Sequence, residues 1–262
     1  MYSPSSKKSP DNLFLYAFFC QCLALLLLYG ACRPVVAFSD DRIIEEELLL
    51  PEENQKTYCL VIDPGHGDKD NGSTLGANLL EKDLTLDIAR KIKKLALADT
   101  GINVVLTRSG DDDVPLENRA ALANHLKADF FLSIHFSNHL YPAQDALWII
   151  TAVYPPEEVE FSSMTNGSWK SMQSRHLIES REFAQRIAKA ARTNETFQSV
   201  NMLEAPVYVL EGASMAAIEV ELGFSATKEA IEKMESDNYR LQVAKDLFQG
   251  ILDYIKEQEE KS

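Results

Sequence analysis

The chain has 262 residues, of which 45% are hydrophobic, and it carries a formal net charge of −14 at pH 7. This length and composition allow one sizeable hydrophobic core, so we expect a single folded domain of roughly 200 residues with short appendages. The acidic balance argues against nucleic acid as a partner, because a polyanion would be repelled.

The amino terminus has the pattern of an export signal. Lys7 and Lys8 precede the apolar run Leu13–Leu28, and small residues follow it. We expect residues 1–37 to be a signal peptide that is cleaved after Ala37. An uncleaved anchor, which would tether the protein to a membrane, is the alternative, because the apolar run is close to the length of a spanning helix.

The segment that follows, residues 38–56, is rich in acidic side chains and shows little helical or strand periodicity. We predict an acidic tether here, with a short amphipathic helix as the alternative. Cleavage after Ala37 leaves Cys59 as the one cysteine of the mature chain. The domain is therefore expected to be held together by its core or by a metal, and not by disulfides.

From Thr57 onward, apolar strands alternate with amphipathic helices. This alternation predicts an α/β domain with a mostly parallel twisted sheet flanked by helices. We place the domain at residues 57–256, followed by a polar tail at residues 257–262. The expected strands are 58–63, 103–107, 130–135, 146–151, 207–210 and 217–222, and the expected helices are 84–98, 116–127, 180–192 and 239–254.

The first predicted strand runs into the sequence VIDPGHGDKDNG, which contains the first candidate site residue, His66. Open α/β sheets place their chemistry at the carboxyl ends of strands, and His66 lies just past such an end. Gly65 and Gly67 allow unusual backbone conformations and leave space around the imidazole. A phosphate-binding loop is the rival explanation, but neither glycine-rich phosphate motif is present.

Two further polar residues are expected at the same edge. His135 ends the apolar run of FFLSIH, and Glu81 begins the first helix. A set of two histidines and one glutamate suggests a zinc site with a fourth position open for water. Each residue also has a structural alternative, such as an acid that complements the helix dipole. The spacing of His66, Glu81 and His135 matches no short zinc motif.

The stretch AAIEVELGF carries two glutamates that alternate with apolar residues. Glu219 and Glu221 therefore project from one face of a predicted strand. Acids on an inner strand are costly without a function. An edge strand with a solvated acidic face is the equally weighted alternative.

Four stretches, in this order, carry a resemblance to a known family: VIDPGHGDKDNG, LLEKDLTLDIA, VVLTRSGDDDVPLENRAALAN…ADFFLSIH and AIEVELGF. They resemble the motifs of the zinc-dependent N-acetylmuramoyl-L-alanine amidases, which cleave bacterial peptidoglycan. The resemblance runs from about Leu60 to about Phe224 and so covers essentially the whole predicted domain. It implies peptidoglycan as the substrate and a location in the periplasm or at the cell wall.

The resemblance also implies roles for individual residues. It places the metal ligands at His66, Glu81 and His135, with Zn²⁺ as the cofactor. It places the catalytic glutamate at Glu221, the acid directly before the matching Leu-Gly-Phe, and it implies that Asp63 orients a ligand. Arg108, Arg119 and Asn124 also match family positions, and we interpret them either as structural residues or as residues that support the metal ligands.

The implied reaction is hydrolysis of the amide between the lactyl group of N-acetylmuramic acid and the L-alanine of the stem peptide. Zinc would polarise the carbonyl and activate water. Glu221 would act as general base and then as general acid. The alternatives are a catalytically weak module that binds the cell wall or a division protein, and a zinc peptidase.

A regulatory element is a separate hypothesis. The segment Val153–Glu182 is long and polar until its end, and long connections in compact domains often serve as lids. We hypothesise that it borders the site, with Glu179 or Glu182 reaching the metal as an inhibitory ligand. A surface excursion with no regulatory role is the alternative. A division protein is a further candidate regulator.

Overall fold

The computed structural model describes residues 57–75, 79–98, 101–137, 145–153, 169–225 and 227–261. The predictions of a signal peptide or anchor and of an acidic tether lie outside these residues. Within the described ranges, no helix is both long enough and apolar enough to cross a membrane.

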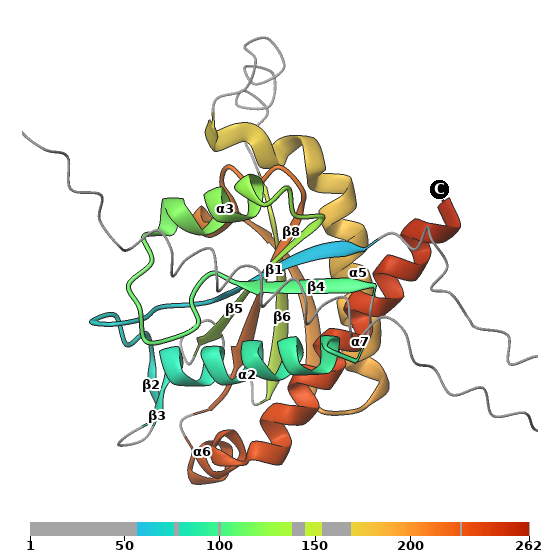
Figure 1. Ribbon diagram of the computed structural model, residues 1–262. Coiled ribbons are helices and arrows are strands. Elements are labelled where there is room, and N and C mark those ends of the chain that lie inside the picture. The colour runs from blue at the N-terminus through green and yellow to red at the C-terminus, as the bar shows by residue number, and fades with distance from the viewer. Residues whose placement is uncertain are drawn as a thin grey trace, which may run out of the picture. The chain divides into compact units, whose positions relative to one another are not determined.

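A six-stranded sheet forms the centre of the domain, in the order β4-β1-β5-β8-β6-β7 (Figure 1). Strands β1, β4, β5 and β8 are parallel, whereas β6 runs antiparallel to β8 and β7 runs parallel to β6. The predicted α/β fold with a mostly parallel sheet is confirmed. The strands are β1 (Tyr58–Pro64), β4 (Ile102–Leu106), β5 (Phe130–Ser137), β6 (Ala146–Ala152), β7 (Ser199–Ala205) and β8 (Ala216–Gly223).

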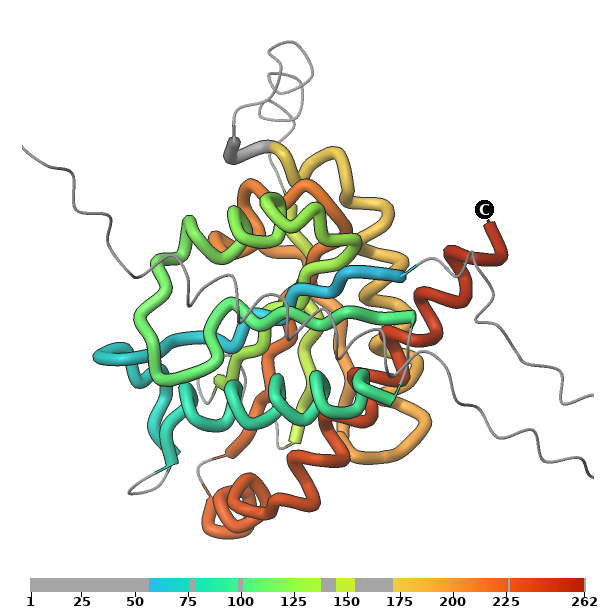
Figure 2. The backbone as a smooth tube through the Cα atoms, in the orientation of Figure 1, coloured from blue at the N-terminus to red at the C-terminus, as the bar shows by residue number. Residues whose placement is uncertain are grey.

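Helices pack on both faces of this sheet. The chain leaves β1 through a loop at the left of Figure 2, forms the small β2–β3 hairpin and then enters α2. The remaining elements are β2 (Thr74–Leu75), β3 (Leu79–Leu80), α2 (Glu81–Ala96), α3 (Leu116–His125), η1 (Trp169–His176), α5 (Leu177–Thr193), η2 (Tyr208–Leu210), α6 (Lys228–Glu235) and α7 (Asp237–Lys261).

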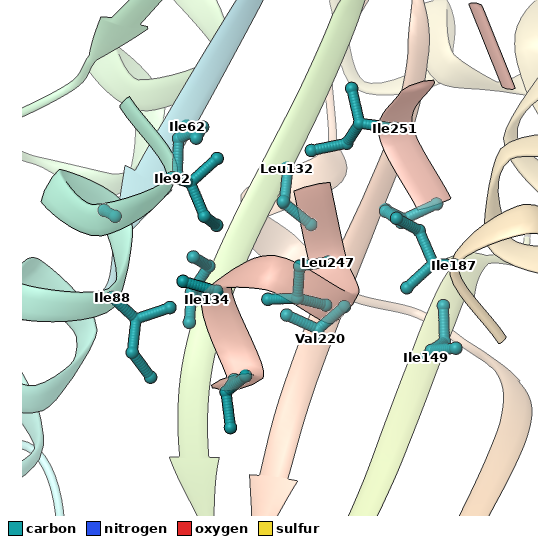
Figure 3. Packing of buried hydrophobic residues seen from close by; sticks show 14 of the residues in the cluster. Ile62, Ile88, Ile92, Leu132, Ile134, Ile149, Ile187, Val220, Leu247 and Ile251 are labelled. Atoms are coloured by element: carbon teal, nitrogen blue, oxygen red, sulfur yellow. The ribbon is translucent and has the colours of Figure 1, made fainter. Parts of the chain in front are cut away.

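The larger core lies between one face of the sheet and helices α2, α5 and α7 (Figure 3). Alternate strand residues point to opposite faces, so a run of β-branched and aliphatic residues can fill two cores at once. The smaller core lies on the other face, under α3 and η2. The larger core includes Ile62, Leu132, Ile134 and Val220 of the sheet with Ile88, Ile92, Ile187, Leu247 and Ile251 of the helices; the smaller one includes Val61, Phe131, Ala217, Ala120, Ala123, Val209 and Leu210.

The close approach of α5 and α7 gives a test of the packing. A Cβ atom on Gly250 would lie 2.6 Å from the Cα atom of Ile187. We expect Gly250→Ala to lower the free energy of unfolding by about 1–3 kcal/mol, because a methyl group there forces the helices apart. Alanine's higher helix propensity offsets at most about 1 kcal/mol of this cost. Urea unfolding measures the change.

The matched control is Gly110→Ala, because the atoms nearest to a Cβ atom there belong to the flexible side chain of Asp112, the first at 3.0 Å. We expect this variant to unfold like the wild type. If Gly250→Ala also unfolded like the wild type, the two helices would not approach each other as closely as described.

Two predictions about the elements were wrong. Residues 207–210, predicted as a strand, belong mostly to η2, and the strand lies earlier, at Ser199–Ala205. Val209 and Leu210 of this segment are buried on the face of the sheet that α3 covers, without pairing in the sheet, whereas β7 is half-exposed and has a mixed composition. The last helix also continues to Lys261, through most of the predicted polar tail. Its final turn is tied to α5 by an ion pair between Lys261 and Glu182.

Candidate functional site

The loop after β1 holds His66 in an unusual backbone conformation. His66 has φ 64° and Asp68 has φ 50°, and Gly67 between them has φ 137°. Residues other than glycine rarely adopt a positive φ, and such strain concentrates at functional sites where the surroundings enforce it. The loop is closed by two backbone hydrogen bonds between Gly67 and Asp70, at 2.9 and 3.0 Å.

Two buried arginines enforce this conformation by binding the backbone of the loop. Arg108 donates to the carbonyl oxygens of Pro64 and Gly65, at 3.0 and 2.8 Å. Arg119 donates to those of Pro64 and His66, at 3.1 and 3.2 Å. Guanidinium groups have several fixed donors, so each arginine can hold two carbonyl groups in place at once. The predicted structural role of both residues agrees with these contacts.

Asp63 is fully buried at the end of β1, where it binds three side chains. One carboxylate oxygen accepts hydrogen bonds from Thr107 and Arg119, at 2.5 and 2.9 Å, and the other accepts one from Ser133 at 2.9 Å. Asp63 thus contacts the ligand loop through Arg119, which binds the carbonyl group of His66. We propose that this indirect contact is how Asp63 orients a ligand.

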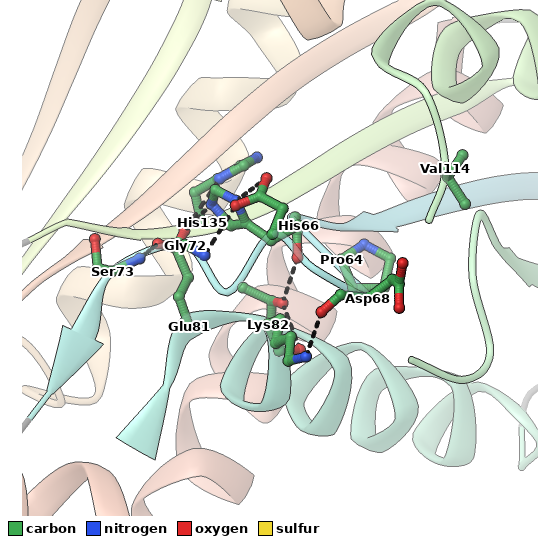
Figure 4. A network of polar contacts seen from close by, with 12 residues as sticks. Pro64, His66, Asp68, Gly72, Ser73, Glu81, Lys82, Val114 and His135 are labelled. Atoms are coloured by element: carbon green, nitrogen blue, oxygen red, sulfur yellow. Dashed lines mark hydrogen bonds and ion pairs between the residues drawn. The ribbon is translucent and has the colours of Figure 1, made fainter. Parts of the chain in front are cut away.

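Glu81 is the centre of the site and is 2% exposed (Figure 4). Its Oε1 lies 2.9 Å from His66 Nε2 and 3.2 Å from His135 Nδ1. Backbone N–H groups hold the carboxylate, with Phe136 donating to Oε1 at 2.9 Å and Ser73 donating to Oε2 at 2.7 Å. The structure therefore brings the three predicted metal ligands together from a loop, a helix and a strand.

The donor set fits a zinc ion. The candidate ligand atoms of His66, Glu81 and His135 all lie within 4.8 Å of one another. Two atoms bound to one tetrahedral zinc lie roughly 3.3 Å apart, and the two atom pairs here are separated by 2.9 and 3.2 Å. Two imidazoles and one carboxylate are the protein ligands of several catalytic zinc sites, which keep a fourth position open.

Two glycines make room for these ligands. A Cβ atom on Gly65 would lie 2.4 to 2.7 Å from ring atoms of His135. A Cβ atom on Gly72, which has φ 63°, would lie 2.5 Å from His66 Cδ2 and 2.6 Å from Glu81 Oε2. No larger residue fits at either position without displacing the side chain of a candidate ligand, so the glycines at these positions follow from the site geometry.

Asp70 is a site residue that the sequence prediction missed. Its Oδ2 lies 2.7 Å from His66 Nδ1, the ring nitrogen that faces away from Glu81. Metal-binding histidines usually bind a carboxylate or carbonyl through their second nitrogen, which fixes the ring orientation. The available signal was the spacing of four residues from His66 to Asp70, with Gly67 between them. Lys82 further pins the loop by donating to the Asp68 carbonyl and to Asp111, at 2.6 and 2.9 Å.

Glu221 lies beside this set. It is the Cα partner of His135 in the parallel β5–β8 pair, so both side chains leave the same face of the sheet. Burial raises the pKa of Glu221, and the charge of Glu219 raises it further, to about 7. Among the described residues, Glu221 Oε2 is buried without a hydrogen-bond partner. A buried carboxylate oxygen with a raised pKa is suited to exchanging a proton with a substrate.

Glu219 lies on the same face of β8, two residues before Glu221 and so further from the carboxyl end of the strand. It is the Cα partner of Ser133, is 8% exposed, and its Oε2 lies 4.0 Å from His135 Nε2. The alternative of a solvated acidic face on an edge strand is therefore wrong, because β8 is an inner strand and Glu219 is buried.

The hypothesis that Glu179 or Glu182 reaches the metal is also wrong. Ser180, between them, accepts a hydrogen bond from the backbone N–H of Ala217 at 3.0 Å, at the start of β8. The candidate metal ligands lie at the opposite end of the parallel strands, where β1 and β5 end. Glu182 instead pairs with Lys261 at 2.9 Å. The rest of the hypothesised lid, at residues 154–168, lies outside the described part of the chain.

Protonation of the two histidines gives a pH-dependent prediction. Burial lowers the pKa of His135, but its hydrogen bond to Glu81 and the nearby charge of Glu219 outweigh this effect and raise the pKa to about 9. The pKa of His66 is also raised: burial opposes protonation, and the bond to Glu81 overcomes this. A histidine binds a metal through a neutral imidazole. A metal therefore competes with protons for the two histidines at pH values below their raised pKa values.

We therefore expect zinc binding to the metal-free protein to release protons at neutral pH. Its affinity should rise from about pH 6 to about pH 9, by up to about tenfold per pH unit for each proton released. Calorimetric titration in buffers of different ionisation enthalpy measures the proton release. An affinity independent of pH over this range would contradict the protonated state described for His135.

The fold and the site define a class: α/β domains with a His, Glu, His candidate metal centre at the carboxyl edge of the parallel strands. Residues 60–253 match the family Amidase_3, N-acetylmuramoyl-L-alanine amidase. The chain belongs to this family, as its motifs predicted.

Relatives and solved structures agree with this assignment. The chain is 26% identical to the amidase AmiC of Escherichia coli over 224 residues, which cover 76% of this chain and 53% of AmiC. It is 29% identical to the amidase LytC of Bacillus subtilis over 198 residues, covering 75% of this chain but 35% of LytC. The crystal structure of an amidase from Clostridium difficile superimposes with a TM-score of 0.63 at 28% identity, covering 77% of this chain and 98% of that one.

Proposed function

We propose that this protein hydrolyses the amide bond between the lactyl group of N-acetylmuramic acid and the L-alanine of the peptidoglycan stem peptide. The chain belongs to a family of N-acetylmuramoyl-L-alanine amidases. The observation that carries the proposal is the convergence of His66, Glu81 and His135 beside Glu221, whose Oε2 is buried without a partner among the described residues.

The chain's own residues have distinct tasks in this reaction. Zinc, when bound by His66, Glu81 and His135, supplies Lewis-acid polarisation of the scissile carbonyl and activation of water. Glu221 accepts a proton from the attacking water and donates it to the departing alanine nitrogen. A pKa near 7 suits both steps, because the group is then neither too weak a base nor too weak an acid at neutral pH.

The residues around the ligands keep this geometry in place. Asp70 fixes the ring of His66, while Arg108 and Arg119 fix the backbone of its loop. Two backbone N–H groups hold the carboxylate of Glu81. Such preformed support is what catalytic zinc sites require for their activity.

Mass spectrometry of the products from purified peptidoglycan sacculi tests the proposal. The full-length, zinc-loaded protein is expected to release intact stem peptides with a free L-alanine amine, and to leave lactyl carboxylates on the glycan. Cleavage within the stem peptide would indicate a zinc peptidase instead. Binding to sacculi without any release would indicate a module that only binds the wall.

We further propose that the protein is exported and acts in the periplasm or at the cell wall. The apolar run Leu13–Leu28 supports export, as does the identity of the relatives AmiC and LytC as amidases of a wall polymer. Fractionation of cells that express the full-length chain, followed by detection of the protein in each fraction, tests the location.

We also propose a division protein as the regulator of the hydrolytic activity.

A further inference from the structure

A row of side chains crosses four neighbouring strands at the site. Glu221 on β8 has His135 on β5 as its Cα partner on one side and Trp148 on β6 as its Cα partner on the other. Trp148 is in turn the Cα partner of Asn201 on β7. Partnered residues leave the same face of a sheet, and neighbouring strands are about 4.8 Å apart. The row therefore extends roughly 10 Å beyond Glu221, away from the candidate metal ligands.

The direction of the Trp148 side chain is supported independently. Leu147 and Ile149, on either side of it, are fully buried in the larger core, so Trp148 points to the opposite face. A Cβ atom on Gly223, two residues after Glu221 on the same face, would lie 3.8 Å from Trp148 Cδ1. The indole thus stands on the Glu221 face and reaches toward the carboxyl end of β8.

Both residues of the extended row are partly exposed. The same face is covered by α3 and η2 nearer the start of β8, where Phe131 and Ala217 are buried in the smaller core. Asn201 is oriented by a hydrogen bond from its Nδ2 to Ser199 Oγ at 3.2 Å. Trp148 therefore presents an aromatic surface and Asn201 an oriented amide, next to the candidate catalytic residues. This combination is typical of a ligand-binding subsite and not of a hydrophobic core.

The chemistry of the proposed function decides which half of the substrate meets this row. Glu221 must donate its proton to the departing nitrogen, so that nitrogen lies next to Glu221. The carbonyl lies on the side of His66, Glu81 and His135. The stem peptide begins at the departing nitrogen, and the row beyond Glu221 leads away from the metal ligands.

We propose that Trp148 and Asn201 bind the stem peptide and make hydrolysis depend on its length. The inference rests on the proposed function. The indole offers a flat apolar surface to the peptide planes that follow the alanine residue. The amide of Asn201 can both donate to and accept from a peptide group. An extended peptide rises about 3.3 Å per residue, so a row of roughly 10 Å spans about three residues of the stem.

Steady-state kinetics with two soluble substrates test this assignment. One substrate is N-acetylmuramoyl-L-alanine, and the other carries a stem of at least three residues. In the zinc-loaded full chain, Trp148→Ala is expected to lower kcat/KM for the long substrate about 10-fold or more, mainly through KM, and to change the short one by less than about twofold. Asn201→Ala is expected to show the same selectivity with a smaller loss.

Two further variants serve as controls. Met202→Ala, on the opposite face of β7 and 41% exposed, should leave both substrates unchanged. Trp148→Phe keeps an aromatic surface and should retain most of the activity on the long substrate. Zinc content and thermal unfolding show which variants are folded; if Trp148→Ala does not fold, Asn201→Ala and Trp148→Phe carry the comparison.

Equal losses on both substrates, or no loss on either, would overturn the inference while leaving the proposed function intact. If the wild-type protein cleaves neither substrate, the proposed function fails. Equilibrium dialysis of a labelled stem peptide then tests the inference alone. Weaker binding to Trp148→Ala than to the wild type would support it, and equal binding would overturn it.

Discussion

Glu221→Gln is expected to lower amide hydrolysis by about 10²-fold or more while leaving zinc content and fold unchanged. Glutamine has nearly the same size as glutamate but cannot accept the proton of the attacking water. The affected oxygen is buried and has no hydrogen-bond partner among the described residues, so the structure gives it no other bond to lose. The release of dye-labelled fragments from sacculi measures the rate, and metal analysis measures the zinc.

Glu219→Gln is the matched control, since the two glutamates lie two residues apart on one face of β8. It should lose less activity, because Glu221, and not Glu219, is the Cα partner of His135. Glu219 has its own contact, at 4.0 Å from His135 Nε2, so a modest loss is expected. A larger loss at Glu219 than at Glu221 would show that the roles are reversed.

His135→Ala is expected to abolish stoichiometric zinc binding. The loss of the metal should lower the rate of hydrolysis by at least about 10²-fold. The wild-type protein should bind about one zinc ion per chain. His66→Ala should have the same effect, because a site with three protein ligands loses most of its affinity when one imidazole is removed. Metal analysis after gel filtration and the sacculus assay measure the two effects.

His125→Ala provides the control for the loss of an imidazole, because His125 is exposed at the end of α3. It should bind zinc and hydrolyse the substrate like the wild type. Stoichiometric zinc in both His66→Ala and His135→Ala would refute the assignment of the ligands. Zinc loss without loss of activity would refute the need for a metal.

Much of the fold near the site could be predicted from the sequence. β1 and β5 are mostly apolar, which is typical of buried parallel strands, and the polar residues near their ends mark the carboxyl end of the parallel strands. The directions of β6 and β7 could not be predicted, because a strand's pattern is the same when its direction is reversed. β7 was missed because it is half-exposed and lacks a strong apolar alternation.

The ligands themselves were harder to predict than the strands. His66 and His135 stood out at strand ends and Glu81 at a helix start, which suggested a zinc site. Their separation along the chain carries no geometry, so the family resemblance was needed to assign the three residues as candidate ligands. Asp70 was missed because it lies among several acids in one loop. Its approach to His66 depends on the positive φ of His66, which the sequence does not reveal.

The two arginines that bind the His66 loop have a consequence for how the protein would acquire a metal ion. Arg108 and Arg119 bind the carbonyl groups of the loop with donors that do not depend on a metal ion. The candidate centre is anchored to a sheet with its own apolar cores. We therefore expect the domain to fold without its metal, unlike zinc fingers, which unfold when the metal leaves. If so, the domain would reach its native structure first and bind an ion afterwards, and a chain that meets too little metal would stay folded and would not be degraded as an unfolded chain.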